Sequence, residues 1–225
     1  MSISGVGAST SSATTARRRT TASSRPQAQA ARSSRLLNVG SSGPAVDALK
    51  SALRAQHYWV DSGSTYTAAT KDAVMAFQKL NGLDRDGIAG PRTLSAIKHP
   101  RRPKLGSGEA NRVVIDLSDQ TLFLIKNNKI SKIVNTSTGN PNLSDGKGIA
   151  TPKGSFRVYT KHPGIDPGPL GNLYWSSYFN GGVAVHGSPS VPGYPASHGC
   201  ARVPMWLDEQ LYGKMPVGMQ VKVRS

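Results

Sequence analysis

The chain has 225 residues, of which 37% are hydrophobic and 18% charged, as is typical of a globular protein of one or two domains. Its formal net charge of +16 favours polyanionic partners such as nucleic acid, anionic lipid headgroups or acidic wall polymers, without choosing among them. The single cysteine excludes an intramolecular disulfide, and the absence of a long apolar run gives no support for a transmembrane helix.

The N-terminal segment, residues 1–35, contains six arginines and no acidic residue. An A-x-A pattern at Ala28 to Ala30 follows the arginine cluster, but the apolar stretch that a secretory signal requires is missing between them. Because the segment has too little apolar surface to offset the entropy of ordering, we expect a disordered basic tail. The sequence therefore shows no clear signal peptide.

Residues 36–98 contain three predicted short helices. The first begins at "GPAVDALKSALRA", where Val46, Leu49 and Leu53 follow the 3.6-residue spacing of one helical face. The second lies in "TAATKDAVMAFQKLNG", with Gly82 as the expected C-terminal cap, and the third in "GPRTLSAI". These elements predict a small all-α domain.

The pattern changes after residues 99–110, which are rich in proline, glycine and charge and are predicted to form a linker. The stretch "RVVIDLSDQTLFLIKNNKISKIVNTSTG" is interpreted as strands of alternating apolar and polar residues, with "KNNK" as a hairpin turn. Further strands are expected in "GSFRVYT", "GGVAVHG" and "MQVKVRS", and one short helix in "PMWLDEQLYGKM". Residues 111–225 are thus predicted to form a mostly β domain.

The only cysteine lies in "AVHGSPSVPGYPASHGCARV", and three interpretations of it are open. A metal site needs about three or four ligands, yet Cys200, His198 and His186 show neither C-x-x-C nor H-E-x-x-H spacing. A buried structural thiol is common, but the surrounding Pro, Ser, His and Gly residues do not resemble a packed element. The third interpretation is a nucleophile whose base is a nearby histidine.

The nucleophile hypothesis gives each neighbouring residue a function. His186 ends the "GGVAVHG" strand and is well placed to accept the thiol proton, although a hydrogen-bonded histidine at a strand edge is the ordinary alternative. The amides of Gly199 and Cys200 could form an oxyanion hole. His198 would position substrate or brace the loop, and Arg202 would hold a carboxylate or else be an ordinary surface charge.

Two resemblances to known families support these interpretations. "AVMAFQKLNGL" and "DGIAGPRTLSAI" make residues 36–98 similar to the small three-helix peptidoglycan-binding domain of bacterial wall enzymes. "VHGSPSVPGYPASHGCARV", with "VVIDLSDQTLFLIKNNKI", "STGN" and "ATPKGSFRV", makes residues 111–225 resemble the YkuD-like L,D-transpeptidase catalytic domain. The chain departs from that pattern in the short gap of ten residues between His186 and Ser197, which suggests a reduced lid, and in Arg202, where many members have asparagine.

The resemblance implies an α+β multidomain fold, with the helical domain followed by the mostly β catalytic domain. It implies that Cys200 attacks the bond before the terminal D-Ala of a tetrapeptide stem and that His186 is the base and acid. Gly187 would orient the His186 ring through its carbonyl, Gly199 would serve the oxyanion hole, and Ser197 and His198 would support the loop. Arg202 would contact substrate.

The partners that follow are peptidoglycan donor and acceptor stem peptides and glycan strands, in the bacterial envelope or outside the cell. No metal or cofactor is expected. Nucleic acid is not expected as a partner either, since aromatic residues are only 6% of the chain and do not interleave with the basic ones. Two alternatives stay open: an L,D-carboxypeptidase of the same fold, and a catalytically silent wall-binding protein.

Overall fold

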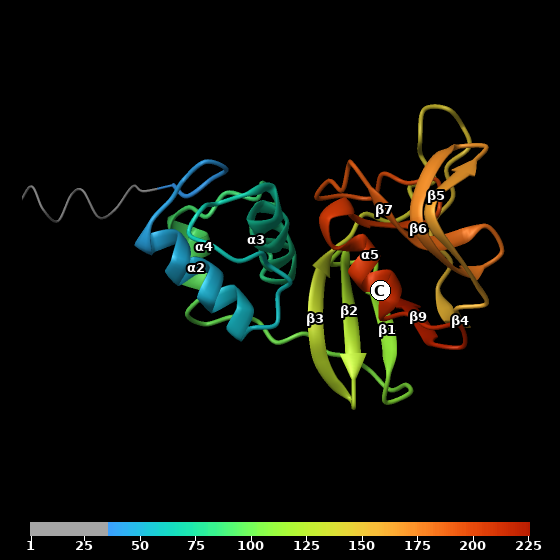
Figure 1. Ribbon diagram of the computed structural model, residues 1–225, viewed down its shortest axis with the longest axis horizontal. Coiled ribbons are helices and arrows are strands. Elements are labelled where there is room, and N and C mark those ends of the chain that lie inside the picture. The colour runs from blue at the N-terminus through green and yellow to red at the C-terminus, as the bar shows by residue number, and fades with distance from the viewer. Residues whose placement is uncertain (1–35) are drawn as a thin grey trace, which may run out of the picture. The chain divides into compact units, whose positions relative to one another are not determined.

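The computed structural model describes residues 36–225, so the predicted basic tail at residues 1–35 lies outside the described residues. Three helices come first along the chain: α2 (Pro44–Ala55), α3 (Ala68–Leu80) and α4 (Pro91–Ala96) (Figure 1). The rest of the described chain consists of strands and one helix, α5 (Met205–Gly213). The predicted fold class, a helical region followed by a β-rich region, is confirmed.

The three predicted helices form for the local reasons that the sequence indicates. Helix α2 begins at Pro44, and its residues Val46, Leu49 and Leu53 are all buried on one face. Helix α3 begins with a capping box between Thr67 and Thr70, which satisfies two otherwise free backbone amides. The chain leaves α3 through Asn81 and Gly82, whose φ of +64° is readily adopted by glycine.

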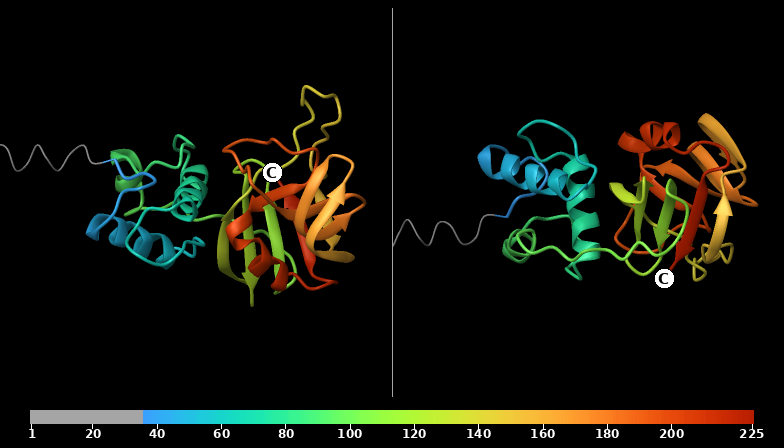
Figure 2. Two further views of the ribbon diagram at one scale, coloured as in Figure 1. Left: turned by 45° about the horizontal axis from the view of Figure 1, so that its top comes forward. Right: turned by 90° about the horizontal axis from the view of Figure 1, so that it is seen from below.

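Two sheets form the β-rich region, and Figure 2 shows them from two further directions. The first sheet has the strand order β3-β2-β1-β9-β4 and the second the order β5-β6-β7-β8. In the first sheet the strands are β1 (Arg112–Asp116), β2 (Thr121–Lys126), β3 (Lys129–Asn135), β4 (Gly154–Arg157) and β9 (Gln220–Arg224). In the second they are β5 (Thr160–Gly168), β6 (Gly171–Asn180), β7 (Val183–Ser188) and β8 (Ala201–Pro204).

The predicted turn at "KNNK" joins β2 to β3, because Asn127 and Asn128 both adopt positive φ, as a tight hairpin requires. The interpretation of β1 and β2 as alternating apolar and polar strands is wrong. Leu122 and Leu124 enter the core shared with the second sheet, whereas Phe123 and Ile125 enter a core shared with the helices. The strands are apolar on both faces because both faces are covered.

The helical region therefore packs directly on the first sheet. Besides the shared apolar core, backbone hydrogen bonds join the chain after α2 to the edge strand β3: Trp59 N donates to Ile133 O at 3.0 Å, and Ile133 N donates to His57 O at 2.9 Å. Residues 99–110 contain no helix or strand, and Leu105 packs against the same core. No helix within residues 36–225 has the length and apolar character needed to cross a membrane.

Candidate active site

Cys200 and His186 line one cavity of about 460 Å³ at the edge of the second sheet. His186 lies on β7 and Cys200 directly precedes β8, and residues 168–173, where β5 turns into β6, also line the cavity. Lys147 and Ile149 contribute a third side, and Arg202 also lines the cavity. With His198, which also lines the cavity, the site combines one thiol, two imidazoles and two basic groups.

The parallel pairing of β7 with β8 brings the chain at Cys200 next to the strand that carries His186. Cys200 directly precedes β8, where Val185 is opposite Ala201 and His186 is opposite Arg202. Ala184 N donates to Cys200 Sγ at 3.4 Å, and Cys200 Sγ lies 3.6 Å from Gly182 O. Because side chains two apart on a strand share a face, His186 points to the same side as Ala184 and the sulfur.

The hydrogen bonding of His186 defines its tautomer. His186 Nδ1 lies 2.8 Å from Gly187 O, and since a carbonyl only accepts, Nδ1 carries the proton. Nε2 is then the free acceptor of the ring. Burial lowers the pKa of His186 to about 4 and raises the pKa of the Cys200 thiol, so that both groups are neutral at pH 7.

The backbone before the cysteine is held by the Ser197 hydroxyl. Ser197 Oγ donates to Cys200 O at 2.5 Å and accepts from Gly199 N at 3.1 Å. The Gly199 amide is therefore engaged inside the loop in this state. Gly199 itself has a φ of +136°, and a Cβ added there would lie 2.8 Å from Ile149 Cγ1, so only glycine fits.

The two remaining predicted residues differ in their orientation. His198 Nε2 lies 2.7 Å from Asp145 Oδ2, a contact that lowers the pKa of that carboxyl. Arg202 lines the cavity near the thiol, and burial lowers the pKa of its guanidinium. In the part of the chain that the structure describes, no group of three His, Cys, Asp or Glu side chains is arranged to hold a metal ion.

Sequence reasoning assigned no function to Thr151, although the structure places it beside the cysteine loop. Thr151 Oγ1 donates to Gly199 O at 2.6 Å and accepts from Gly139 N at 2.8 Å. A Cβ at Gly139 would come within 2.8 Å of the Gly199 Cα, which explains the glycine. Thr151 lies in "ATPKGSFRV" and Gly139 in "STGN", two segments that resemble the family. That resemblance is the sequence signal that could have identified both residues.

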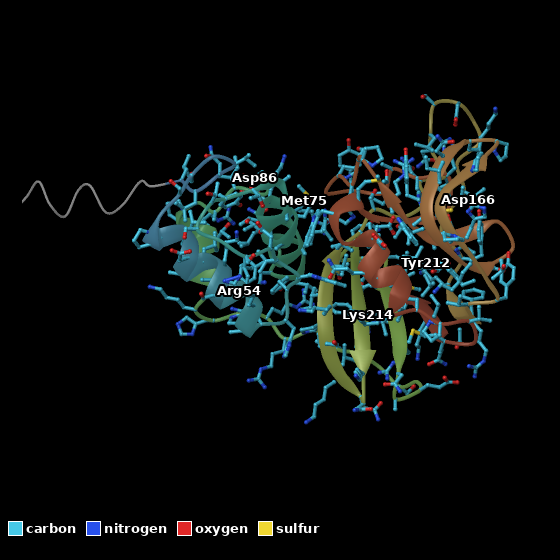
Figure 3. All side chains as sticks on the ribbon, viewed as in Figure 1. Arg54, Met75, Asp86, Asp166, Tyr212 and Lys214 are labelled. Carbon is cyan, nitrogen blue, oxygen red and sulfur yellow. The ribbon has the colours of Figure 1, made fainter. Side chains whose placement is uncertain are left out.

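A second pair that sequence reasoning missed lies on the neighbouring strands β5 and β6 of the same sheet. Tyr178, on β6, lines the cavity, and its hydroxyl donates to Asp166 Oδ2 at 2.6 Å. Figure 3 labels Asp166 on the β5–β6 hairpin. Burial and the neighbouring carboxylate raise the pKa of Tyr178 to about 12, which keeps its hydroxyl protonated. No sequence signal marked this pair, because the β5 strand is rich in glycine and proline and was not predicted.

Comparisons with known proteins agree with this architecture. The L,D-transpeptidase catalytic domain family matches residues 110–223, and a peptidoglycan binding domain family matches residues 42–97. The crystal structure of an L,D-transpeptidase from Xylanimonas cellulosilytica is similar, with 37% identity and a TM-score of 0.74 over 83% of this chain and 96% of that one. A comparison with curated proteins gives no match.

A second similar structure is an L,D-transpeptidase from Stackebrandtia nassauensis, with 22% identity and a TM-score of 0.51 over 84% of this chain and 94% of that one. At this identity the likeness speaks for the fold alone. The family match covers half of the chain and includes every residue predicted for the site, from His186 to Arg202. This chain belongs to the L,D-transpeptidase catalytic domain family and carries a peptidoglycan-binding domain before it.

Proposed function

We propose that this protein is a cysteine L,D-transpeptidase that acts on the tetrapeptide stems of peptidoglycan. The observation that carries the proposal is the shared cavity, which is lined by the single thiol, directly before β8, and by an imidazole with a free Nε2 on the adjacent parallel strand β7. The family match and the peptidoglycan-binding domain supply the substrate class.

In the first step, Cys200 Sγ attacks the carbonyl between the diamino acid at the third position and the terminal D-Ala. His186 Nε2 accepts the thiol proton as the sulfur–carbon bond forms, and then donates it to the nitrogen of the departing D-Ala. A thioester between Cys200 and the stem remains. Because thiol and imidazole are both neutral before substrate binds, proton transfer accompanies attack, and no preformed ion pair is needed.

In the second step, the side-chain amine of a neighbouring stem attacks the thioester. His186 Nε2 takes a proton from that amine, the carbon–sulfur bond breaks, and the thiol regains its proton. The product is a 3→3 cross-link. No metal or organic cofactor takes part in either step, and the amide bond that is lost supplies the energy for the bond that forms.

The other predicted site residues support these steps. The Cys200 amide stabilises the developing oxyanion, and Gly199 joins it when substrate displaces the hydrogen bond from Gly199 N to Ser197 Oγ. Arg202 and Lys147 give the cavity a positive side that suits a stem carboxylate. His198 is turned to Asp145 and braces the loop, and Gly187 orients the His186 ring through its carbonyl.

The peptidoglycan-binding domain associates the enzyme with the cell wall, where the substrate is insoluble. Holding the catalytic domain at the wall raises the local concentration of stems. The net charge of +16 favours the same location, because anionic wall polymers attract a basic surface. The acceptor and donor stems and the glycan strands are thus the partners of this chain.

Mass spectrometry of the purified protein with a disaccharide-tetrapeptide tests the proposal. We expect a cross-linked dimer that has lost one D-Ala and an acyl-enzyme on Cys200. The Cys200→Ala variant should form neither, and His186→Gln should lower the acylation rate by at least about a hundredfold. Circular dichroism of each variant serves as the control for folding.

The other outcomes have definite meanings. Tripeptide monomer alone would assign the protein as an L,D-carboxypeptidase, in which water resolves the thioester. No product and no acyl-enzyme from folded protein that still binds isolated wall would leave a wall-binding protein. Either result would overturn transpeptidation as the activity.

A further inference from the structure

The chain between the predicted base and nucleophile, residues 189–196, contains no helix or strand. It is nevertheless anchored at four consecutive carbonyls. Asn135 Nδ2 donates to Val191 O at 3.1 Å, and Ser137 Oγ donates to Tyr194 O at 2.7 Å. The two carbonyls between these accept hydrogen bonds from the helical domain. The path from His186 to Cys200 is therefore built partly by a different domain.

Lys79, near the end of α3, provides the first of these contacts. Its side chain is only 1% exposed, and its Nζ lies within 3.2 Å of four oxygens on the catalytic domain. One of them is Pro192 O at 3.2 Å, and the shortest contact, at 2.6 Å, is to Asn135 Oδ1. Because Asn135 also binds Val191 O, Lys79 fixes the segment both directly and through Asn135.

Arg85, in the loop after α3, provides the second contact. Its Nη1 donates to Gly193 O at 2.9 Å, and its Nη2 donates to Ser118 O at 3.3 Å. The approach is close, since a Cβ added at Gly193 would lie 2.8 Å from Arg85 Cβ. One planar guanidinium thus ties the 189–196 segment to the turn after β1.

We infer that Lys79 and Arg85 of the peptidoglycan-binding domain are positioning residues of the active site, which hold the 189–196 segment so that Ser197 and Cys200 face His186. Residues 189–196, within the gap between His186 and Ser197, contain no helix or strand whose own hydrogen bonds would hold them in place. The helical domain supplies the missing support. It is then a structural part of the catalytic centre as well as a wall anchor.

The rest of the interface allows this role to be tested without separating the domains. Asp72 accepts from Trp206 Nε1 at 3.0 Å, and the apolar core that includes Phe77 and Phe123 joins the helices to the first sheet. Arg85 is itself exposed, so its removal leaves no buried charge. Arg85→Ala should therefore fold, with the domains still docked.

The test compares Arg85→Ala and Lys79→Met with Arg54→Ala in the full chain. Arg54, on α2 and labelled in Figure 3, donates to a backbone carbonyl as Arg85 does. Its acceptor, Asp61 O at 3.0 Å, lies within the helical domain itself. The matched variant thus removes the same kind of hydrogen bond without touching the 189–196 segment.

We expect amide hydrogen exchange of residues 191–199 to become about tenfold faster in Arg85→Ala, and faster still in Lys79→Met. Alkylation of Cys200 by iodoacetamide at pH 7 should become about threefold faster, because a loosened loop hydrates the thiol and lowers its raised pKa. Turnover of the disaccharide-tetrapeptide should show kcat lowered about tenfold, with KM and binding to isolated wall unchanged. Arg85→Lys should recover part of the loss.

Faster exchange that is confined to residues 191–199, with unchanged exchange in the helices and strands, distinguishes loss of positioning from unfolding. Exchange and alkylation rates in folded Arg85→Ala that equal those of Arg54→Ala would overturn the inference, whatever Lys79→Met does. The turnover readout alone rests on the proposed function. If the unaltered protein shows no turnover, the proposed function fails, and the exchange and alkylation rates still decide whether the helical domain positions the loop.

Discussion

Two segments lead to the Cys200 cavity, and they are held in different ways: residues 189–200, which reach it at Ser197, and the β5–β6 hairpin. The 189–196 segment has four consecutive carbonyls, Val191 to Tyr194, each hydrogen-bonded to a different residue outside it. The β5–β6 hairpin is paired with β7 and contacts α5 through Lys161 Nζ, which donates to Tyr212 O at 2.8 Å, but its side chains Ile165 and Leu170 are 58% and 47% exposed. Residues 189–200, here called the fixed wall, are held by side chains from outside the segment, whereas the hairpin, here called the adaptable wall, presents exposed side chains.

This difference indicates a division of labour between the walls. Attack on a carbonyl requires thiol, base and amide donors within a fraction of an ångström of their places, which favours a wall that is over-determined by hydrogen bonds. Stem peptides that project from an insoluble polymer need an opening that adapts to them.

The neutral state of the buried His186 should have the largest effect on stability. Its pKa is about 4 in the folded protein and about 6.5 when unfolded, so below pH 6.5 the unfolded chain binds a proton that the folded chain does not. Stability is therefore greater above pH 6.5 and falls by about 3 kcal/mol as the pH drops through 4. Urea denaturation at pH 7, 5.5 and 4 measures this.

The matched variant is His186→Gln, which cannot take up the proton. Between pH 7 and pH 4, the free energy of unfolding of this variant should fall by about 3 kcal/mol less than that of the unaltered protein. Equal pH dependence in the two proteins would contradict a buried neutral imidazole. The kcat/KM of the unaltered enzyme should fall on the acid side only near pH 4, where His186 Nε2 becomes protonated and can no longer accept the thiol proton.

Gly199→Ala should break the fixed wall at its tightest point. The new Cβ would require a φ near +136° and would lie 2.8 Å from Ile149 Cγ1, so the backbone next to Cys200 has to move. We expect turnover to fall by about a hundredfold, since a displacement of about 1 Å at the reacting atoms has this effect. Gly213→Ala, where a Cβ meets nothing within 4 Å, is the control and should keep full activity.

Thr151→Val should have a smaller effect on the same wall. It leaves Gly199 O and Gly139 N buried without their partner, which destabilises the fold by about 1–3 kcal/mol. Turnover should drop about tenfold, because the loop keeps its backbone conformation but loses one brace. Thr151→Ser keeps the hydroxyl and should remain near the unaltered protein in both denaturation and turnover. A neutral Thr151→Val would show that the loop does not depend on this brace.

Much of this architecture could be predicted from local sequence. The spacing of Val46, Leu49 and Leu53 defined α2, and the short motif around Cys200 led to the cavity that it shares with His186. Those signals arise from neighbours within a few positions along the chain. They are carried by periodicity, capping and turn chemistry, which act over the same range.

The contacts that fix the cavity could not be predicted in this way. Lys79 reads as an ordinary polar position on a helix, yet it meets Pro192, which lies 113 positions further along the chain. The consecutive apolar residues of β2, which include Phe123 and Ile125, are typical of a strand covered on both faces. Such a pattern does not say which part of the chain covers the strand. Long-range docking becomes visible only when the two surfaces are seen together.

Leu170→Ala should have the smallest effect on stability, because Leu170 lies in the turn of the β5–β6 hairpin, on the adaptable wall. Leu170 is 47% exposed and lines the cavity, so its truncation should change the free energy of unfolding by less than about 0.5 kcal/mol. The KM for the disaccharide-tetrapeptide should rise about threefold with kcat unchanged, as expected when only substrate contact is lost. A loss of kcat comparable to that of Thr151→Val would instead mean that both walls hold the reacting groups, and the proposed division between a fixed and an adaptable wall would be wrong.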